Sequence, residues 1–175
     1  MAETEPVTEL DSGFSSPGAV AIEWARGLNV LQRAAIYWVS TVRPYARPHV
    51  TPLLGVWRDG AMYFCTGAGE RKAKNLEKNS HCILTTGANT LDDGIDVVVE
   101  GEALQVTDTA ELASVADVYE SKYGAHFTAP EGTWFGLGDS MRRGETLVYR
   151  VAPVTVLGFG KGEEFTQTRW RFVGP

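Results

Sequence analysis

The alternation of apolar and polar residues along the chain predicts a mainly β protein with a few helices. Residues 18–33 show helical periodicity, because Val20, Trp24 and Leu31 lie on one stripe. Later segments are rich in β-branched and aromatic residues and are separated by turn signals, as strands are. Strands are therefore expected over residues 35–42, 50–57, 61–66, 82–86, 96–106, 146–159 and 165–172.

The connections between these strands indicate an antiparallel barrel. A short basic helix is expected after the third strand, and Gly101 marks a bulge. Asp108 is expected to cap a helix that runs to about Tyr123. Residues 128–144 are polar and rich in glycine, which predicts a surface loop able to face a ligand. Six or seven strands joined mostly by short turns predict a barrel with attached helices, and not alternating βαβ units.

The length of 175 residues predicts one domain over residues 18–175. Residues 1–17 are polar and contain Pro6, Gly13 and Pro17, which predicts a flexible N-terminal arm. This segment lacks the basic and apolar regions of a signal peptide, and no apolar run is long enough to span a membrane. We therefore expect a cytoplasmic protein without membrane insertion.

Charge and cysteine usage narrow the function classes. A net charge of −6 and a pI near 5.1 disfavour general nucleic-acid binding, which uses a basic surface. Cys65 and Cys82 fall inside expected strands and are interpreted as small buried hydrophobes. His81 points away from Cys82 on its strand, so no metal site is expected. No set of residues for nucleophilic catalysis is recognisable, and no catalytic side chain is assigned.

Residues 66–76, Thr-Gly-Ala-Gly-Glu-Arg-Lys-Ala-Lys-Asn-Leu, carry the most chemical information. Gly67 and Gly69 let the backbone approach a ligand, and the following helix start favours an anion. Arg71 and Lys72 are unfavourable at a helix start unless an anion such as phosphate lies between them. The alternative is a hairpin loop with solvated basic residues. The loop lacks the Gly-Lys-Ser/Thr ending of a P-loop nucleotidase.

These elements resemble the split β-barrel flavoprotein group that includes pyridoxamine 5′-phosphate oxidase. The resemblance is best over residues 35–106 and returns in the segment Phe-Thr-Gln-Thr-Arg-Trp-Arg-Phe at residues 165–172. It implies an FMN-binding-like split β-barrel and a homodimer with its cofactor in a cleft between the two barrels. The residues implied to bind the cofactor are His49, Val50, Thr51, Pro52, Cys65, Thr66, Gly67, Arg71, Lys72, Asn75, Arg169 and Trp170.

The chain also departs from the oxidase pattern. The strand that lies along the flavin ring begins with Arg and ends with Lys in the oxidase, whereas this chain has Thr51 and Val56. A Gln near the cofactor is replaced by Asp96, and a Trp by Phe159. The residues that grip the vitamin phosphate have no counterparts in residues 118–136. These departures argue against a vitamin B6 oxidase.

A second set of segments resembles the actinobacterial branch of this superfamily that uses the deazaflavin coenzyme F-420. The matching segments are residues 38–44 and 47–52, Trp57, Arg71-Lys72, Asn75-Leu76 and the Thr-Arg-Trp-Arg-Phe ending. The resemblance implies hydride transfer between the reduced deazaflavin and an unsaturated or carbonyl-containing small molecule. The alternatives are an FMN oxidoreductase of the same fold, a protein that stores F-420 without turnover, and a dimeric barrel with no redox ligand.

Overall fold

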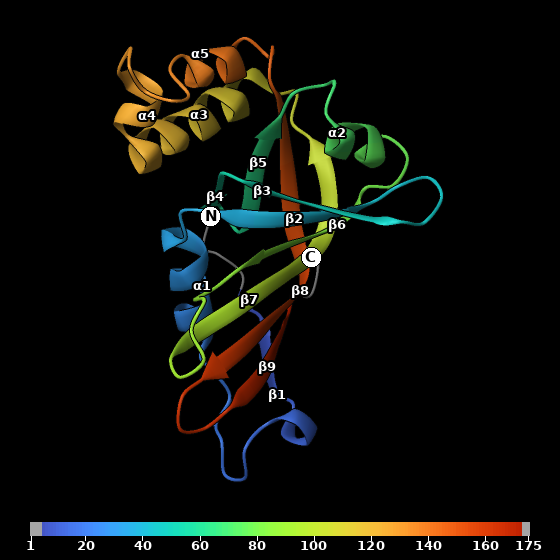
Figure 1. The fold of residues 1–175 in the computed structure, drawn as a ribbon, viewed down its shortest axis with the longest axis vertical. Helices are drawn as coiled ribbons and strands as arrows, with labels where there is room; N and C mark the ends of the chain where they lie inside the picture. The colour runs from blue at the N-terminus through green and yellow to red at the C-terminus, as the bar shows by residue number, and fades with distance from the viewer. Residues whose placement is uncertain (1–4, 173–175) are drawn as a thin grey trace.

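The computed structural model describes residues 5–172, and within them nine antiparallel strands form one sheet with helices packed around it (Figure 1). The strands are β1 (Val7–Leu10), β2 (Tyr37–Val42), β3 (Pro48–Leu53), β4 (Gly55–Arg58), β5 (Ala61–Thr66), β6 (His81–Thr86), β7 (Gly94–Gln105), β8 (Leu147–Lys161) and β9 (Thr166–Arg171). The helices are α1 (Trp24–Arg33), α2 (Arg71–Leu76), α3 (Thr109–Tyr123), α4 (Ala125–Thr128) and α5 (Leu137–Arg142), with a short 3-10 helix, η1, at Ser12–Phe14.

The long strand β8 organises the split barrel. Its first residues, Leu147–Val151, pair with β5, and its later residues, Thr155–Gly160, pair with β9. Strand β7 follows β8 along its whole length and changes register between Glu100 and Gly101. The bulge expected at Gly101 is therefore confirmed, and it bends the sheet where β8 changes partner. In the described residues, the sheet path ends at β1 and β3 without closing.

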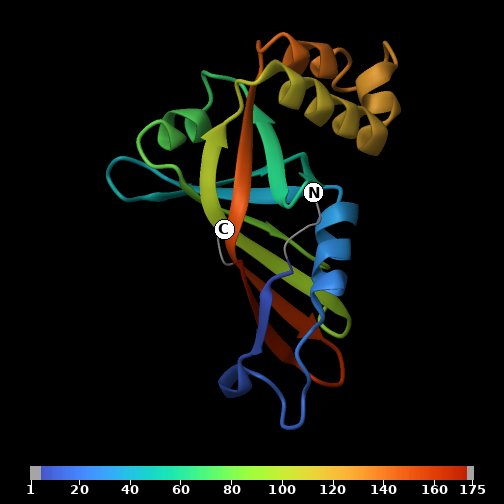
Figure 2. The same ribbon diagram turned by 180° about the vertical axis from the view of Figure 1, so that it is seen from behind.

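Two apolar clusters hold the elements together. One lies between α1 and the sheet and includes Trp24, Leu31 and Trp170. The other lies between β4, β5 and the helices α3 to α5, with Tyr119 and Phe127 at its centre. Figures 1 and 2 show α1 against one side of the sheet, α3 to α5 at one end, and α2 beside the β2–β3 hairpin. No helix of the described chain is both long and apolar enough to cross a membrane.

The N-terminal segment differs from the expected flexible arm. Val7–Leu10 forms β1, which pairs with β9, and the Ser16 N–H donates to the Phe165 carbonyl at 2.8 Å. Residues 1–4 of that arm lie outside the described residues. Helix α1 begins at Trp24 and not at residue 18, because the Ile22 N–H donates to Thr168 Oγ1 at 2.9 Å and holds the preceding backbone on β9. Val20 is consequently 78% exposed and does not extend the apolar stripe.

The single strand expected over residues 50–57 is two strands with different partners. β3 pairs with β2, whereas β4 pairs with β5. The chain turns at Gly55, where a Cβ would come within 3.0 Å of the Tyr37 ring. The Tyr123 hydroxyl donates to the Gly55 carbonyl at 2.8 Å and fixes the turn. Val56, expected beside a cofactor ring, is buried in the cluster under α3.

Candidate functional site

Four of the twelve residues predicted to bind a cofactor line one cleft. These are Pro52, on β3, Cys65 and Thr66, at the end of β5, and Gly67 in the loop that follows. The cleft has a volume of about 410 Å³, which is within the usual range for small-molecule sites. Its remaining lining residues are Ile36, Leu53, Leu54, Glu70, Trp134, Leu137 and Thr146. The loop after β5 and the α4–α5 segment therefore meet at one small-molecule-sized space.

The loop before α2 is arranged around Glu70. This carboxylate accepts a hydrogen bond from the Gly67 N–H at 2.8 Å and pairs with the Lys72 ammonium. Lys72 is only 6% exposed, whereas Arg71 faces solvent. Desolvation alone would raise the pKa of Glu70, but the Lys72 ammonium and the Gly67 N–H outweigh it and hold the pKa below its usual value. Arg71 and Lys72 were expected to hold an anion between them, but they lie in different environments. Lys72 already pairs with the Glu70 carboxylate.

The glycines of this loop are not required by its backbone. Among the described glycines, neither Gly67 nor Gly69 has a left-handed φ. A Cβ at Gly69 would meet nothing within 4 Å. Their small size therefore leaves open space above the loop, which suits a ligand lying close to the backbone.

Three buried polar atoms of the described residues have no hydrogen-bond partner, and all three belong to the β2–β3 hairpin or to α2. They are Arg43 Nε, Thr51 Oγ1 and Asn75 Oδ1. The Asn75 amide donates to Thr41 Oγ1 at 2.9 Å, and its oxygen stays unpaired. Because buried polar groups are nearly always hydrogen-bonded, these unpaired atoms make the hairpin and α2 a candidate ligand-binding region.

Positive charge gathers around His49 in the same corner. His49 lies on β3 opposite Thr41 on β2. Desolvation lowers the pKa of its imidazole, and the positive charges of Arg43, Lys72 and Arg71 lower it further. His49 is therefore neutral at neutral pH, and the field at this corner favours an anion.

Cys65 presents a neutral thiol to the cleft. Burial raises its pKa to about 11, so the thiolate form is scarce at neutral pH. The side chains that line the cleft are of kinds that can bind and orient a small molecule.

Within one chain, three of the predicted residues lie outside this corner, namely Val50, Arg169 and Trp170. Val50 is 52% exposed on the outer face of β3. Arg169 is exposed on β9, which lies at the other end of the sheet from α2 in both views (Figures 1 and 2). Trp170 is completely buried, packs edge-on against Trp24 at 5.4 Å and donates from Nε1 to the Ile22 carbonyl at 3.1 Å. Its expected contact with a cofactor is not compatible with this position.

Sequence reasoning missed several residues of the site. Glu70 was part of the recognised loop, and its acidic side chain at a helix start was a usable signal. Trp134 and Leu137 belong to the segment that was expected to be a loop. That segment instead follows α4 with turns held by backbone hydrogen bonds and then forms α5. Arg43 had no local signal, because its unpaired Nε depends on the packing of the hairpin.

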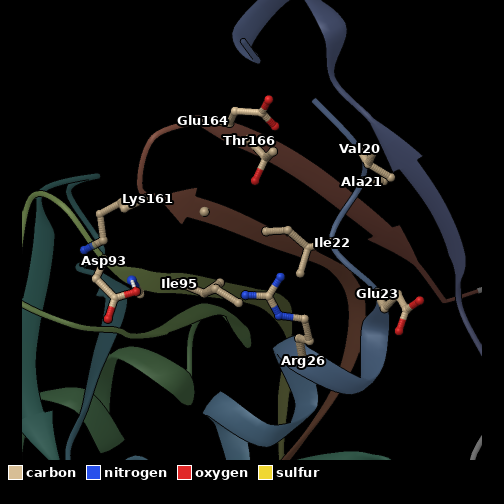
Figure 3. Close-up of a pocket in the computed structure, with 12 residues that line it drawn as sticks. Val20, Ala21, Ile22, Glu23, Arg26, Asp93, Ile95, Lys161, Glu164 and Thr166 are labelled. Atoms are coloured by element: carbon tan, nitrogen blue, oxygen red, sulfur yellow. Dashed lines mark hydrogen bonds between the residues drawn. The ribbon is translucent and has the colours of Figure 1, made fainter. Parts of the chain in front are cut away.

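A second hollow, of about 500 Å³, lies between the N-terminal segment, the start of β7 and the β8–β9 turn (Figure 3). Figure 3 shows the Arg26 guanidinium directed into it beside Ile22 and Ile95. None of the predicted site residues lines this hollow. Its charges are of both signs, and Lys161 already bonds to Asp96 at 3.0 Å. We take as the candidate site the cleft together with the neighbouring corner of the β2–β3 hairpin and α2, because four predicted residues line the cleft and Glu70 joins it to Lys72 of α2.

Comparison with known proteins identifies relatives at the level of family and fold. The family model described as pyridoxamine 5′-phosphate oxidase matches residues 28–159, well over half of the chain. No curated protein sequence matches. A conserved hypothetical protein from Mycobacterium tuberculosis is similar in structure with a TM-score of 0.65 at 20% identity, over 90% of this chain and 96% of that one.

Two further solved structures share the fold. A putative 5-nitroimidazole antibiotic resistance protein from Bacteroides thetaiotaomicron has a TM-score of 0.63 at 13% identity, over 97% of this chain and 93% of that one. An FAD binding protein from Mycobacterium smegmatis has a TM-score of 0.54 at 19% identity, over 86% and 98% of the two chains. The expected split-barrel fold is thereby confirmed.

Proposed function

Because the chain belongs to the pyridoxamine 5′-phosphate oxidase family, we propose that it is a homodimeric oxidoreductase that uses the deazaflavin coenzyme F-420. The observation that carries this proposal is the corner formed by the β2–β3 hairpin and α2. There, three buried polar atoms lack partners and three cations surround a neutral His49. Arg43 Nε and the Thr51 hydroxyl could donate to the phosphate oxygens of a bound cofactor, whereas Asn75 Oδ1 could accept only from a hydroxyl or N–H group of that cofactor.

The distribution of charge favours the deazaflavin over FMN. Strand β3 carries no acidic or basic side chain that could anchor an anion beside the ring, apart from the neutral His49. Arg71, Lys74 and Lys78 are exposed on and just after α2. A long polyglutamate tail that leaves past this helix gains more from several cations than a single phosphate does. Each exposed contact is modest and weakened by salt.

A bound deazaflavin would supply the two-electron chemistry as a hydride carrier, and the protein's own residues position it. Pro52 and Leu53 line the cleft from β3, which supports a flat ring laid along this strand. Thr66 and Gly67 place their polar groups at the end of the cleft nearest Lys72. His49 supplies an uncharged, polar imidazole on β3, opposite Thr41 of β2. The site thus combines an apolar surface for a ring with a cationic corner for an anionic tail.

The homodimer is supported by the outer face of the sheet, opposite α1. Directly paired residues share a face, so the register links Pro52, Trp38, Thr85, Val98, Leu157 and Arg169 in one row across the sheet. Trp38 is 49% exposed and Val50, on the same face, 52%. A second copy laid on this face covers these apolar side chains and presents its own Arg169 to the cofactor. Trp170, on the opposite face of β9, has no part in this surface.

Turnover tests the proposal. Reduced F-420 is mixed with the full chain and benzylideneacetone, a neutral conjugated ketone, with and without oxygen. We expect oxidation of the cofactor that requires both protein and ketone and consumes no oxygen. Oxidation driven by oxygen alone contradicts a deazaflavin oxidoreductase. Tight F-420 binding without turnover, with this ketone and a panel of other enones, favours the storage protein.

Sedimentation velocity tests the dimer separately. Trp38→Asp places a charge in the proposed interface and is expected to yield monomers. Leu91→Asp is the matched control, because Leu91 is 88% exposed in the loop between β6 and β7. A wild-type monomer with full cofactor affinity contradicts the shared cleft.

A further inference from the structure

We propose that the Trp134 end of the cleft binds the hydride acceptor, and that this acceptor is a neutral, flat, aromatic or conjugated molecule. The inference rests on the proposed function, since it assigns the second substrate of the same site. It concerns the wall formed by Trp134, Leu137, Ile36 and Leu54, which we call the apolar wall.

The apolar wall and the loop before α2 give the cleft two different ends. Thr66, Gly67 and Glu70 supply polar groups at one end, near Lys72. Trp134 and Leu137 line the cleft from the α4–α5 segment. Helices α4 and α5 pack beside α3 (Figure 1). Of the described residues that line the cleft, Glu70 is the only charged one. An anionic acceptor would therefore meet no opposite charge along the lining, and a cationic one would meet only Glu70, which already pairs with Lys72. The lining thus favours a neutral molecule.

Backbone hydrogen bonds and neighbouring aromatic rings hold Trp134 in a defined position. The backbone N–H of Trp134 donates to the His126 carbonyl at 2.8 Å, and its backbone carbonyl accepts from the Leu137 N–H at 3.0 Å. Its ring lies edge-on to His126 at 5.6 Å and near Phe127 at 6.4 Å. The indole is nevertheless 38% exposed. A fixed aromatic ring that keeps an exposed face at the edge of a cleft is suited to stacking with a flat ligand.

The backbone around Trp134 is also rigid. Gly136 has a φ of 77° and begins α5, and a Cβ at Gly132 would come within 2.8 Å of the His126 carbonyl oxygen and closer still to that of Ala125. Helix α5 is anchored to α3 by Arg142, whose guanidinium bonds to the Glu120 carboxylate at 2.8 and 2.7 Å. The apolar wall is thus preformed, and a ligand binds it without first ordering a loop.

The Thr146 hydroxyl offers a polar group to the carbonyl oxygen of the hydride acceptor. Thr146 lines the cleft and shares a hydrogen bond with Ser140 at 2.8 Å. The Cys65 thiol is protonated at neutral pH, so it contributes a soft, neutral surface. A conjugated ketone matches this lining, with its ring on Trp134 and its carbonyl toward the hydroxyls.

Binding of benzylideneacetone to the full chain without cofactor tests the inference, with pent-3-en-2-one as the analogue that lacks the ring. Isothermal titration is run on wild type, Trp134→Ala, Trp134→Phe and Phe135→Ala. Phe135 is the matched control, because it is 56% exposed beside Trp134 but does not line the cleft. We expect Trp134→Ala to weaken benzylideneacetone binding about tenfold. Trp134→Phe should retain most of the affinity, and Phe135→Ala all of it.

Unchanged binding in Trp134→Ala, an equal loss in Phe135→Ala, or equal affinity of wild type for both ketones would overturn the inference. Near-ultraviolet circular dichroism and the retained affinity of Trp134→Phe show that the fold is intact. Because the titration uses no cofactor, its result is independent of whether F-420 binds. A chain that binds the aromatic ketone through Trp134 but binds no F-420 refutes the proposed function alone.

Discussion

Replacing Lys72 with alanine tests the role of the most deeply placed cation of the site. Lys72 is 6% exposed and pairs with Glu70, so its ammonium is held at the end of the cleft with little freedom. A charge-assisted hydrogen bond to phosphate contributes about 1.5–3 kcal/mol, which corresponds to a roughly tenfold to hundredfold loss of cofactor affinity. The loss should lie toward the upper end, because the substitution also leaves the Glu70 carboxylate unpaired beside the incoming phosphate.

The assay is a fluorescence titration of the cofactor-free chain with F-420. Lys74→Ala is the matched control, since Lys74 lies on the same helix but faces solvent, and its loss should be about threefold or less. Glu70→Gln keeps the shape of the Lys72 partner while removing its charge, and it should bind at least as tightly as wild type. Lys72→Ala with wild-type affinity, or a loss of equal size in Lys74→Ala, would remove Lys72 from the cofactor site.

Two predictions concern stability and pH. Burial lowers the pKa of Lys122 to about 8 from 10.5, and its ammonium donates to Tyr37 Oη and the Gly55 carbonyl, both at 2.9 Å. At this site the unfolded chain therefore binds more protons between these values, so the contribution of Lys122 to the free energy of unfolding should rise as pH increases from about 8. Burial raises the pKa of the Cys65 and Cys82 thiols and acts in the opposite direction, so the rise is read as the difference between wild type and Lys122→Met in denaturant titrations at each pH. Gly132→Ala should cost about 1–3 kcal/mol, because backbone carbonyls occupy the space of its Cβ, whereas Gly69→Ala, with nothing within 4 Å, should change stability little in the same assay.

Local motifs were the most predictable part of the fold. The helix cap at Asp108 accepts the Glu111 N–H at 2.8 Å, as the spacing of the two residues indicated. The bulge at Gly101 also followed from one residue in a strand pattern. In contrast, the α4–α5 segment is built from short helices that depend on distant partners. Arg142 reaches Glu120, which is 22 residues away, and no local periodicity reports such an anchor.

The candidate site was predictable where its residues lie on one loop or strand. Thr66 and Gly67 line the cleft together, as the glycine-rich stretch suggested. Arg169 and Trp170 could not both face one ligand from the same chain, because successive residues of a strand point to opposite faces. That alternation was available from the sequence. The sequence did not show which face of the sheet α1 covers. Trp170 is buried because it packs against Trp24 of that helix.

We propose that the basic corner beside β3 selects a deazaflavin with a long anionic tail. The decisive measurement is equilibrium binding of F-420 and FMN to the cofactor-free chain, followed by fluorescence over a range of salt concentrations. We expect tighter binding of F-420 at low ionic strength, with a difference that shrinks as salt screens the exposed cations Arg71, Lys74 and Lys78. Tighter binding of FMN at every salt concentration would contradict the claim and support the FMN oxidoreductase instead.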